Sequence, residues 1–212
     1  MLKDKLSREH TYLRISLTEK CNLRCTYCMP ENGVDLRPSR EYMTSDEVLH
    51  LAKVFVGLGV NKIRLTGGEP LVFKEFDKVL AGLSKLPVEL SVTTNGLLLE
   101  KYFESLTKAG VETLNISIDT LDDEKFKKIT RRDGLSKVWK AIHQSLNRGF
   151  RVKLNVVVMK GFNDDEIIDF VNLTKELPID IRFIEFMPFD GNEWLWDKVC
   201  LLYTSPSPRD RS

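Results

Sequence analysis

The sequence lacks several features that mark whole classes of protein. It has no uninterrupted apolar run of about 18 residues, the length that a membrane crossing needs, and no apolar stretch of signal-peptide length near residue 1. Its 32 basic and 31 acidic residues leave a net charge of only +1, so the basic excess typical of nucleic-acid-binding proteins is also missing. We therefore expect a soluble cytoplasmic protein with neither a membrane nor a nucleic acid as its partner.

Length and composition favour one folded domain followed by a foreign tail. The chain has 212 residues, of which 42% are hydrophobic, enough for a packed core. From residue 200 it reads CLLYTSPSPRDRS, a run without periodicity that resembles a translated sequencing adapter. We predict a folded domain at 1–190, the start of a further C-terminal domain at 191–199, and a non-native tail at 200–212.

Short β-rich runs alternate with amphipathic stretches of helical length. The predicted strands are Tyr12–Leu17, Lys62–Thr66, Val88–Thr93, Thr113–Ile118, Arg151–Met159 and Ile179–Phe186. The predicted helices are Ser45–Leu58, Phe73–Leu86, Leu98–Ala109, Leu135–Arg148 and Asp164–Leu177. Repeated strand–helix–strand units imply right-handed crossovers and a parallel sheet. The charged run Lys125–Lys128 is interpreted as solvated helix surface.

Side-chain alternation within the strands predicts how the sheet is covered. One face of each strand is apolar, whereas the other carries Arg14, Arg64, Thr93, Ser117 and Lys153. A parallel sheet with helices on both faces would be apolar on both. We therefore predict an α/β fold of the partial (β/α)6 type, a TIM-like barrel with a polar lumen. A half-exposed mixed sheet is the alternative.

Three cysteines follow the first predicted strand with the spacing C-x3-C-x2-C: Cys21, Cys25 and Cys28. An odd number of thiols fits disulfides poorly, and no histidine stands at a zinc-ligand spacing from them. Iron–sulfur clusters are held by thiolates, usually four, so three would leave one iron open to another ligand. We predict one 4Fe-4S cluster with an open iron. A non-catalytic metal-binding module that holds zinc is the alternative.

The cysteine motif, with Tyr27 before its last cysteine, resembles the signature of the radical S-adenosylmethionine (radical SAM) superfamily. The run TGGEP at 66–70 is similar to the loop that holds the methionyl amino group of SAM in that family. A closer resemblance is to the GTP 3′,8-cyclases of molybdenum cofactor biosynthesis. It rests on the blocks LRISLTEKCNLRCTYCMP, KIRLTGGEPL, TTNGLLL, LNISIDTLD, VKLNVVVMKGFND and IRFIEFMPF.

This resemblance implies specific roles for residues of this chain. It implies that Cys21, Cys25 and Cys28 hold the cluster. The positions that match SAM contacts are Tyr27, Gly68, Ser117 and Met187. The positions that match GTP contacts are Arg14, Arg64, Thr93 and Lys153. Three cations on one inner face also suit a triphosphate. The alternative is that these cations pair with Glu89, Asp119 or Glu185.

The resemblance also implies a reaction and its partners. The expected enzyme is a lyase that converts GTP to 3′,8-cyclo-7,8-dihydro-GTP, using SAM and a low-potential electron donor. Its product would pass to a cyclic pyranopterin monophosphate synthase, and a homodimer is an open option. The family carries a second 4Fe-4S cluster on C-terminal cysteines that have no counterpart here, so we expect this chain to have little cyclase activity. Another radical SAM enzyme, such as a peptide-modifying maturase, is the alternative.

Overall fold

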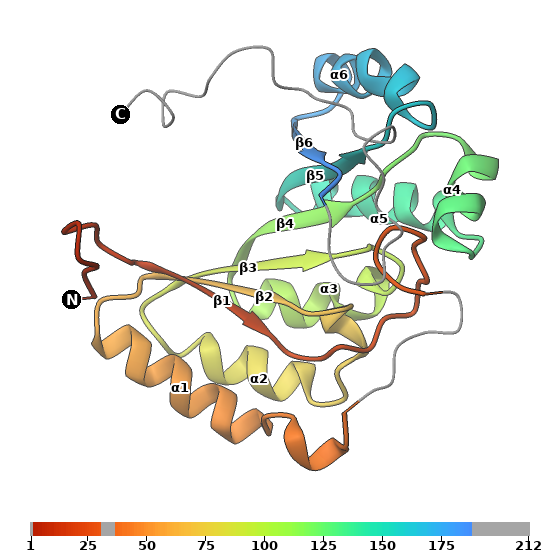
Figure 1. Cartoon of the computed structure of the whole chain (residues 1–212). Coiled ribbons are helices and arrows are strands. Elements are labelled where there is room, and N and C mark those ends of the chain that lie inside the picture. Colours follow the sequence, from red (N-terminus) through yellow and green to blue (C-terminus); the bar gives the residue numbers. More distant parts are fainter. Residues whose placement is uncertain (1, 31–36, 188–212) are drawn as a thin grey trace.

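The computed structural model describes residues 2–30 and 37–187 (Figure 1). The predictions for 191–199 and 200–212 therefore lie outside the described residues. No helix in the described ranges has the length and apolarity that a membrane crossing requires.

A single sheet of six parallel strands organises the described chain. The strands are β1 (Tyr12–Ser16), β2 (Lys62–Thr66), β3 (Glu89–Thr94), β4 (Val111–Ser117), β5 (Arg151–Val158) and β6 (Ile179–Glu185). They lie in chain order from β1 to β6, so the predicted parallel α/β fold is confirmed. Because successive right-handed crossovers never reverse direction, every connecting helix lies on the same face. Within the described residues β1 and β6 are the free edges, and the barrel is incomplete.

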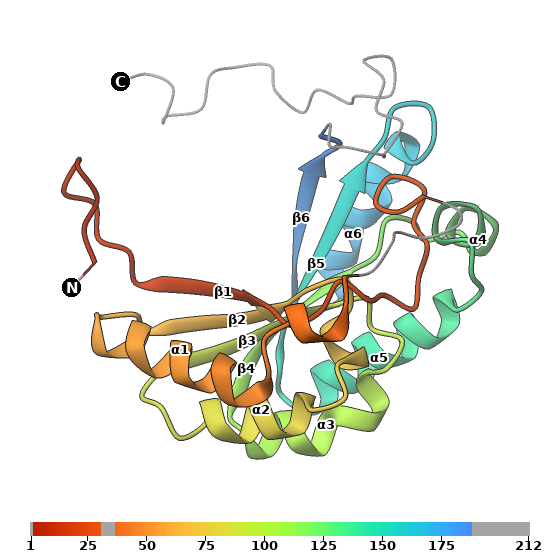
Figure 2. The same cartoon turned by 60° about the horizontal axis from the view of Figure 1, so that its bottom comes forward.

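Six α-helices occur within the described ranges. They are α1 (Ser45–Gly57), α2 (Phe76–Leu83), α3 (Leu99–Lys108), α4 (Asp123–Thr130), α5 (Leu135–Asn147) and α6 (Ile167–Glu176). Figure 2 shows the sheet curving, with α1, α2, α3 and α5 along its outer face. Two helices begin three residues later than predicted. A 3-10 turn, Asp164–Glu166, occupies the predicted start of α6, and a turn at 74–75 precedes α2.

The start of α1 illustrates how the sequence sets an element boundary. The Thr44 hydroxyl accepts a hydrogen bond from the Glu47 N–H at 3.3 Å, and the Glu47 carboxylate accepts the Thr44 N–H at 2.7 Å. This reciprocal capping box satisfies two backbone donors that the first turn leaves without helical partners. Further along α1, Val48 and Ala52 are buried against the sheet.

The core lies between the outer face of the sheet and the helices. Ile63, Leu114 and Val152, from β2, β4 and β5, are completely buried there, as are Phe76 of α2 and Phe170 of α6. Burying apolar surface is the main favourable contribution to folding, at roughly 25 cal/mol per Å². The predicted alternation therefore holds: apolar side chains face the helices and stabilise the fold, which leaves the concave face to polar ones.

No bounds were predicted for helix α4, although the run 125–128 within it was interpreted as helix surface. Only Phe126 and two residues at its C-terminal end, Ile129 and Thr130, are buried, so its apolar stripe is too short to recognise by periodicity. The Asp122 carboxylate caps the helix by accepting the Lys125 N–H at 2.7 Å. The interpretation of 125–128 as solvated surface is wrong for Lys125, whose ammonium is held between two carboxylates, as described below.

Candidate functional site

The three cysteines lie in the loop that follows β1, at the C-terminal edge of the sheet. All three are free thiols; Cys21 and Cys25 are partly buried, and Cys28 is exposed. The N–H groups of Cys28 and Met29 both donate to the Cys25 carbonyl at 2.9 Å, which turns the chain tightly between the last two thiols. The Cys21 sulfur accepts the Leu23 N–H at 3.4 Å.

Without a bound metal, the surroundings of these cysteines favour the neutral thiol over the thiolate. Desolvation raises the pKa of all three thiols, including that of Cys28, although Cys28 as a whole residue is exposed. The neighbouring sulfurs and the Asp119 carboxylate reinforce the shift at Cys25 and Cys28. A bound cation reverses this preference, because a coordinated thiol loses its proton. Three unpaired soft donors on one short loop therefore fit an iron–sulfur cluster. The described residues contain no set of three His, Cys, Asp or Glu side chains arranged to hold a single metal ion.

The glycines of the TGGEP loop let that loop pack against the cysteine loop. A Cβ atom on Gly67 would lie 2.5 Å from the Thr18 carbonyl oxygen, and one on Gly68 would lie 2.5 Å from that of Lys20. Gly67 also has φ +151°, a backbone conformation that residues other than glycine rarely adopt. The Gly68 N–H donates to Thr18 O at 2.6 Å. The two glycines therefore allow a close approach to the backbone at the start of the cysteine loop.

Glu69 is a part of this site that the sequence did not reveal. Its side chain is almost completely buried and accepts three hydrogen bonds, from the Thr94 hydroxyl at 2.8 Å, the Asn95 N–H at 2.7 Å and the Leu71 N–H at 3.1 Å. Burial raises the pKa of Glu69, and the three donors oppose the shift. The carboxylate therefore ties the loop after β2 to the end of β3.

Tyr27, the aromatic residue of the cysteine motif, is anchored to the end of β4. Its hydroxyl donates to the Asp119 carboxylate at 2.8 Å, and the other oxygen of Asp119 accepts the Val157 N–H at 2.8 Å. Burial raises the pKa of Asp119 to about 6, although both hydrogen bonds favour its charged form. The Tyr27 ring also packs edge-to-face against Phe186, with centroids 6.4 Å apart. The cysteine loop thus contacts both β4 and the residue that follows β6.

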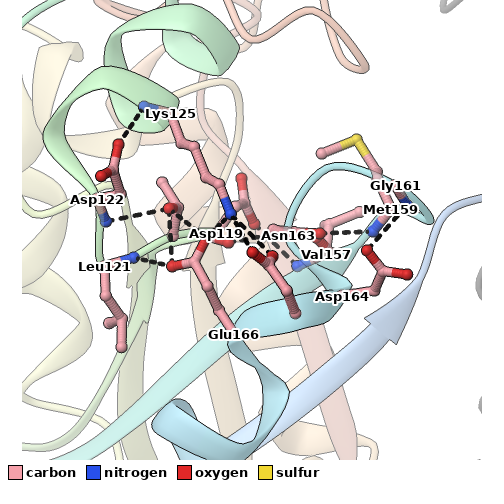
Figure 3. A network of polar contacts seen from close by, with 12 residues as sticks. Asp119, Leu121, Asp122, Lys125, Val157, Met159, Gly161, Asn163, Asp164 and Glu166 are labelled. Carbon is pink, nitrogen blue, oxygen red and sulfur yellow. Dashed lines mark hydrogen bonds and ion pairs between the residues drawn. The ribbon is translucent and has the colours of Figure 1, made fainter.

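A polar network beside Asp119 joins the ends of β4 and β5 to α4 (Figure 3). Asn163 donates to the Asp119 carbonyl at 2.6 Å and accepts the Met159 N–H at 2.8 Å. The buried Glu166 carboxylate accepts the Thr120 hydroxyl at 2.8 Å and the Lys125 ammonium at 2.9 Å. Each buried polar group has a partner, as a rigid network requires.

The concave face carries a group of arginines. Arg14 and Arg64 are paired across β1 and β2, and Arg64 also lies over the Tyr12 ring at 5.3 Å. Burial lowers the pKa of Arg64, and the neighbouring charges of Arg182 and Arg14 lower it further. Arg182, on β6, donates to the Asn115 side chain at 3.0 Å. Sequence reasoning missed Arg182, although the alternation along β6 would have placed it on the same face.

Lys153 does have a carboxylate partner, but not one of the three that the sequence suggested. Its ammonium lies 2.9 Å from Asp180, which faces it in the register of β5 and β6. Glu89 pairs instead with Lys62 at 2.7 Å. The register between parallel strands cannot be predicted from the sequence here, because these strands are joined by helices and not by a tight turn that would fix their alignment.

The other predicted contact residues lie on or beside the same concave face. Thr93 is on β3, and its hydroxyl oxygen is buried without a hydrogen-bond partner among the described residues. Ser117 is the last residue of β4, and Gly68 is exposed in the loop after β2. Met187 follows Phe186 and is exposed. The structure thus brings the predicted SAM positions to the C-terminal edge of the sheet and the GTP positions to its concave face.

Geometry alone defines a class: an incomplete parallel α/β barrel with a three-thiol loop after its first strand and cations along its inner face. Residues 15–174 match the radical SAM superfamily. The match spans more than half of the chain, so the chain belongs to this superfamily.

Individual relatives sharpen this assignment. The chain is 56% identical over 195 residues to molybdenum cofactor biosynthesis protein moc-5 of Caenorhabditis elegans, covering 90% of this chain and 32% of that one. It is 54% identical over 197 residues to the mitochondrial GTP 3′,8-cyclase of Arabidopsis thaliana, covering 92% and 50%. The chain therefore spans between about a third and a half of these relatives.

The fold also matches a solved structure. Streptococcus suis SuiB bound to S-adenosylmethionine superposes with a TM-score of 0.71 at 21% identity, covering 90% of this chain and 43% of SuiB. At this identity the likeness concerns the fold alone, and it agrees with the incomplete barrel described above.

Proposed function

We propose that this chain is the radical SAM part of a GTP 3′,8-cyclase, a lyase of molybdenum cofactor biosynthesis. The observation that carries the proposal is the group formed by Arg14, Arg64 and Arg182 on the concave face. The hydrogen-bond acceptors of Arg64 and Arg182, Ser91 and Asn115, are neutral, so these contacts do not compensate the repulsion among the three positive charges. A triphosphate supplies the missing negative charge, and guanidinium groups bind phosphate oxygens in pairs.

Cys21, Cys25 and Cys28 would hold a 4Fe-4S cluster with one open iron, and SAM would bind beside it. Such a cluster would supply the electron for the reductive cleavage of SAM. Three protein ligands are one fewer than such clusters usually have, so Cys21, Cys25 and Cys28 would leave one iron for SAM. The chain's own contribution is to position the reactants and exclude water.

The remaining contact residues take the roles that the resemblance assigns. Tyr27, Gly68, Ser117 and Met187 would contact SAM at the C-terminal edge of the sheet. Arg14, Arg64, Thr93 and Lys153 would bind GTP. For Lys153 this would require exchanging Asp180 for a phosphate oxygen, which would keep the ammonium paired with an anion. The unpartnered Thr93 hydroxyl would gain a hydrogen bond, which recovers part of the desolvation cost that it bears in the protein alone.

Further assignments follow from the same family resemblance. We propose a low-potential electron donor and, downstream, a cyclic pyranopterin monophosphate synthase as partners. A second 4Fe-4S cluster, a homodimer and a cytoplasmic location also stay predictions.

The direct test is GTP binding measured by calorimetry under anaerobic conditions. Arg64→Gln should weaken GTP binding at least tenfold, because a hydrogen bond to a charged group contributes about 1.5–3 kcal/mol. The matched control is Lys140→Gln, which removes the same charge from the outer helix α5, where Lys140 pairs with Glu100. Guanosine should bind equally to both variants if Arg64 contacts the phosphates.

The results separate the proposal from its alternatives. Equal GTP affinity in the Arg64 and Lys140 variants would contradict the phosphate site. Binding of a peptide with no measurable binding of GTP would favour a peptide-modifying radical SAM enzyme. A single zinc ion bound in place of iron, with no affinity for SAM, would favour a non-catalytic metal-binding module.

A further inference from the structure

The C-terminal end of α4 meets the cysteine loop. The Arg24 N–H donates to the Thr130 carbonyl at 3.0 Å, and the Thr26 N–H donates to the Ile129 carbonyl at 2.8 Å. The last carbonyls of a helix have no partners within it, so they are available for this contact. Backbone groups on either side of Cys25 are therefore held by α4, a helix distant from the cysteines in sequence.

Arg131 adds a second connection at the same place. It follows α4 directly, and its guanidinium Nη1 donates to the carbonyls of Arg24 at 3.0 Å and Met29 at 3.1 Å. These two carbonyls bracket the segment that contains Cys25 and Cys28. One side chain thus fixes the distance between the two ends of the segment.

The backbone conformation of Arg131 is energetically unfavourable, which indicates that the contacts around Arg131 hold it in place. Its φ is +55°, in the left-handed region that residues with a Cβ atom rarely adopt. Such a conformation typically costs 1–3 kcal/mol and persists where surrounding contacts determine it. Glycine would adopt it freely, yet the position holds a residue whose side chain reaches the cysteine loop.

We propose that Arg131 is a positioning residue that holds the Arg24–Met29 segment in the shape that presents Cys25 and Cys28 to the cluster. The identification of these cysteines as cluster ligands rests on the proposed function, whereas the clamp on the segment does not. Arg131 contacts neither thiol in the described structure. Its effect is to reduce the conformational freedom that the loop would otherwise lose when a cluster binds.

Amide hydrogen exchange tests the clamp without any cofactor. Arg131→Gly removes the guanidinium and lets the backbone keep its conformation. We expect the N–H groups of Arg24 and Thr26 to exchange about tenfold faster, since one charge-assisted hydrogen bond contributes about this factor. Arg131→Lys, which keeps a charged donor on a side chain that is one atom shorter, should give a smaller increase. The control is Arg132→Ala, because Arg132 is exposed and, among the described residues, its guanidinium donates only to the Arg131 carbonyl, at 2.8 Å.

The same variants are then loaded with iron and sulfide under anaerobic conditions, and the loss of the visible chromophore is followed after a chelator is added. Arg131→Gly should lose it about tenfold faster than the starting protein, and Arg132→Ala should not differ. Unchanged exchange at Arg24 and Thr26 would overturn the proposal, as would an equal increase in exchange throughout the sheet. Failure of every form to bind iron would count against the proposed function, while the exchange experiment would still decide the clamp.

Discussion

The two faces of the sheet are built from the same strands, but the outer face carries buried apolar side chains and the concave face carries cations. On the outer face, side chains such as Leu114 and Val152 are completely buried against helices. On the concave face, Arg14, Arg64 and Lys153 stand at strand positions directly beside the buried residues Ile15, Leu65 and Val152. The outer face lowers the free energy of the folded state, whereas like charges on the inner face raise it. Stability and ligand binding are therefore separated by the direction in which a strand side chain points.

The largest change in stability is expected on the outer face. Leu114→Ala should lower the free energy of unfolding by about 2–5 kcal/mol, because it removes buried apolar surface and leaves a cavity. Chemical denaturation measured by circular dichroism would show the shift. A loss well below 1 kcal/mol would mean that the outer face is not the packed core.

Asp119 provides a test at the junction between the faces. Its folded-state pKa is raised from 3.8 to about 6, so the folded protein binds a proton more tightly than the unfolded chain. The resulting stabilisation is complete below about pH 3.8 and is lost as the pH rises through about 6. Asp119→Asn lacks this titration but can still accept the Val157 N–H and donate to Tyr27.

The stability of Asp119→Asn relative to the original protein should therefore increase between pH 4 and 6 and stay level above pH 7. The change should be about 2–3 kcal/mol, from roughly two pKa units. Melting both proteins without metal between pH 4 and 7 measures it, because the groups whose pKa the Asp119 charge raises, Tyr27, Cys25 and Cys28, titrate above this range. A pH-independent difference would contradict the raised pKa.

Tight packing of the TGGEP loop against the cysteine loop can be tested at Gly68. Gly68→Ala should destabilise the protein by about 1–3 kcal/mol, since the new methyl group would overlap rigid backbone at Lys20. Gly57→Ala is the matched control: nothing lies within 4 Å of its Cβ position, and alanine should stabilise α1 by up to about 1 kcal/mol. Thermal unfolding that ranks the two variants the other way would show that the glycine loop is not tightly packed.

The smallest effect on stability is expected on the concave face. Thr93→Val replaces a buried hydroxyl that has no partner in the described structure by a methyl group of similar size, so stability should stay equal or rise by up to about 1 kcal/mol. GTP affinity should nevertheless fall if the hydroxyl contacts the nucleotide. A marked loss of stability would mean that this face contributes to the core as the outer face does.

Much of the fold could be predicted because alternation along strands is a local property of the sequence. All six predicted strands are present, and the polar face lies where their alternation placed it. What failed depends on tertiary contacts. Helix α4 has too few apolar residues for periodicity to reveal it, although Asp122 at its N-cap and the lysines in its last turn were usable signals.

The site was predicted less completely than the fold, for a physical reason. The cysteine spacing identified the loop, but nothing in the sequence indicated that Arg131 adopts a left-handed conformation and reaches Met29. The pairing of Lys153 with Asp180 depends on the register of β5 and β6, and the burial of Glu69 depends on where β3 ends. Such contacts join segments far apart in the chain, and local patterns do not encode them.

The central claim is that Cys21, Cys25 and Cys28 hold a cluster whose open iron binds SAM. Its most direct test is iron analysis combined with electron paramagnetic resonance after anaerobic reconstitution and reduction with dithionite. We predict about four irons per chain and a spectrum that changes when SAM is added, both lost in Cys25→Ser. Reconstituted protein without bound iron, or with a cluster whose spectrum is unaffected by SAM, would contradict the claim.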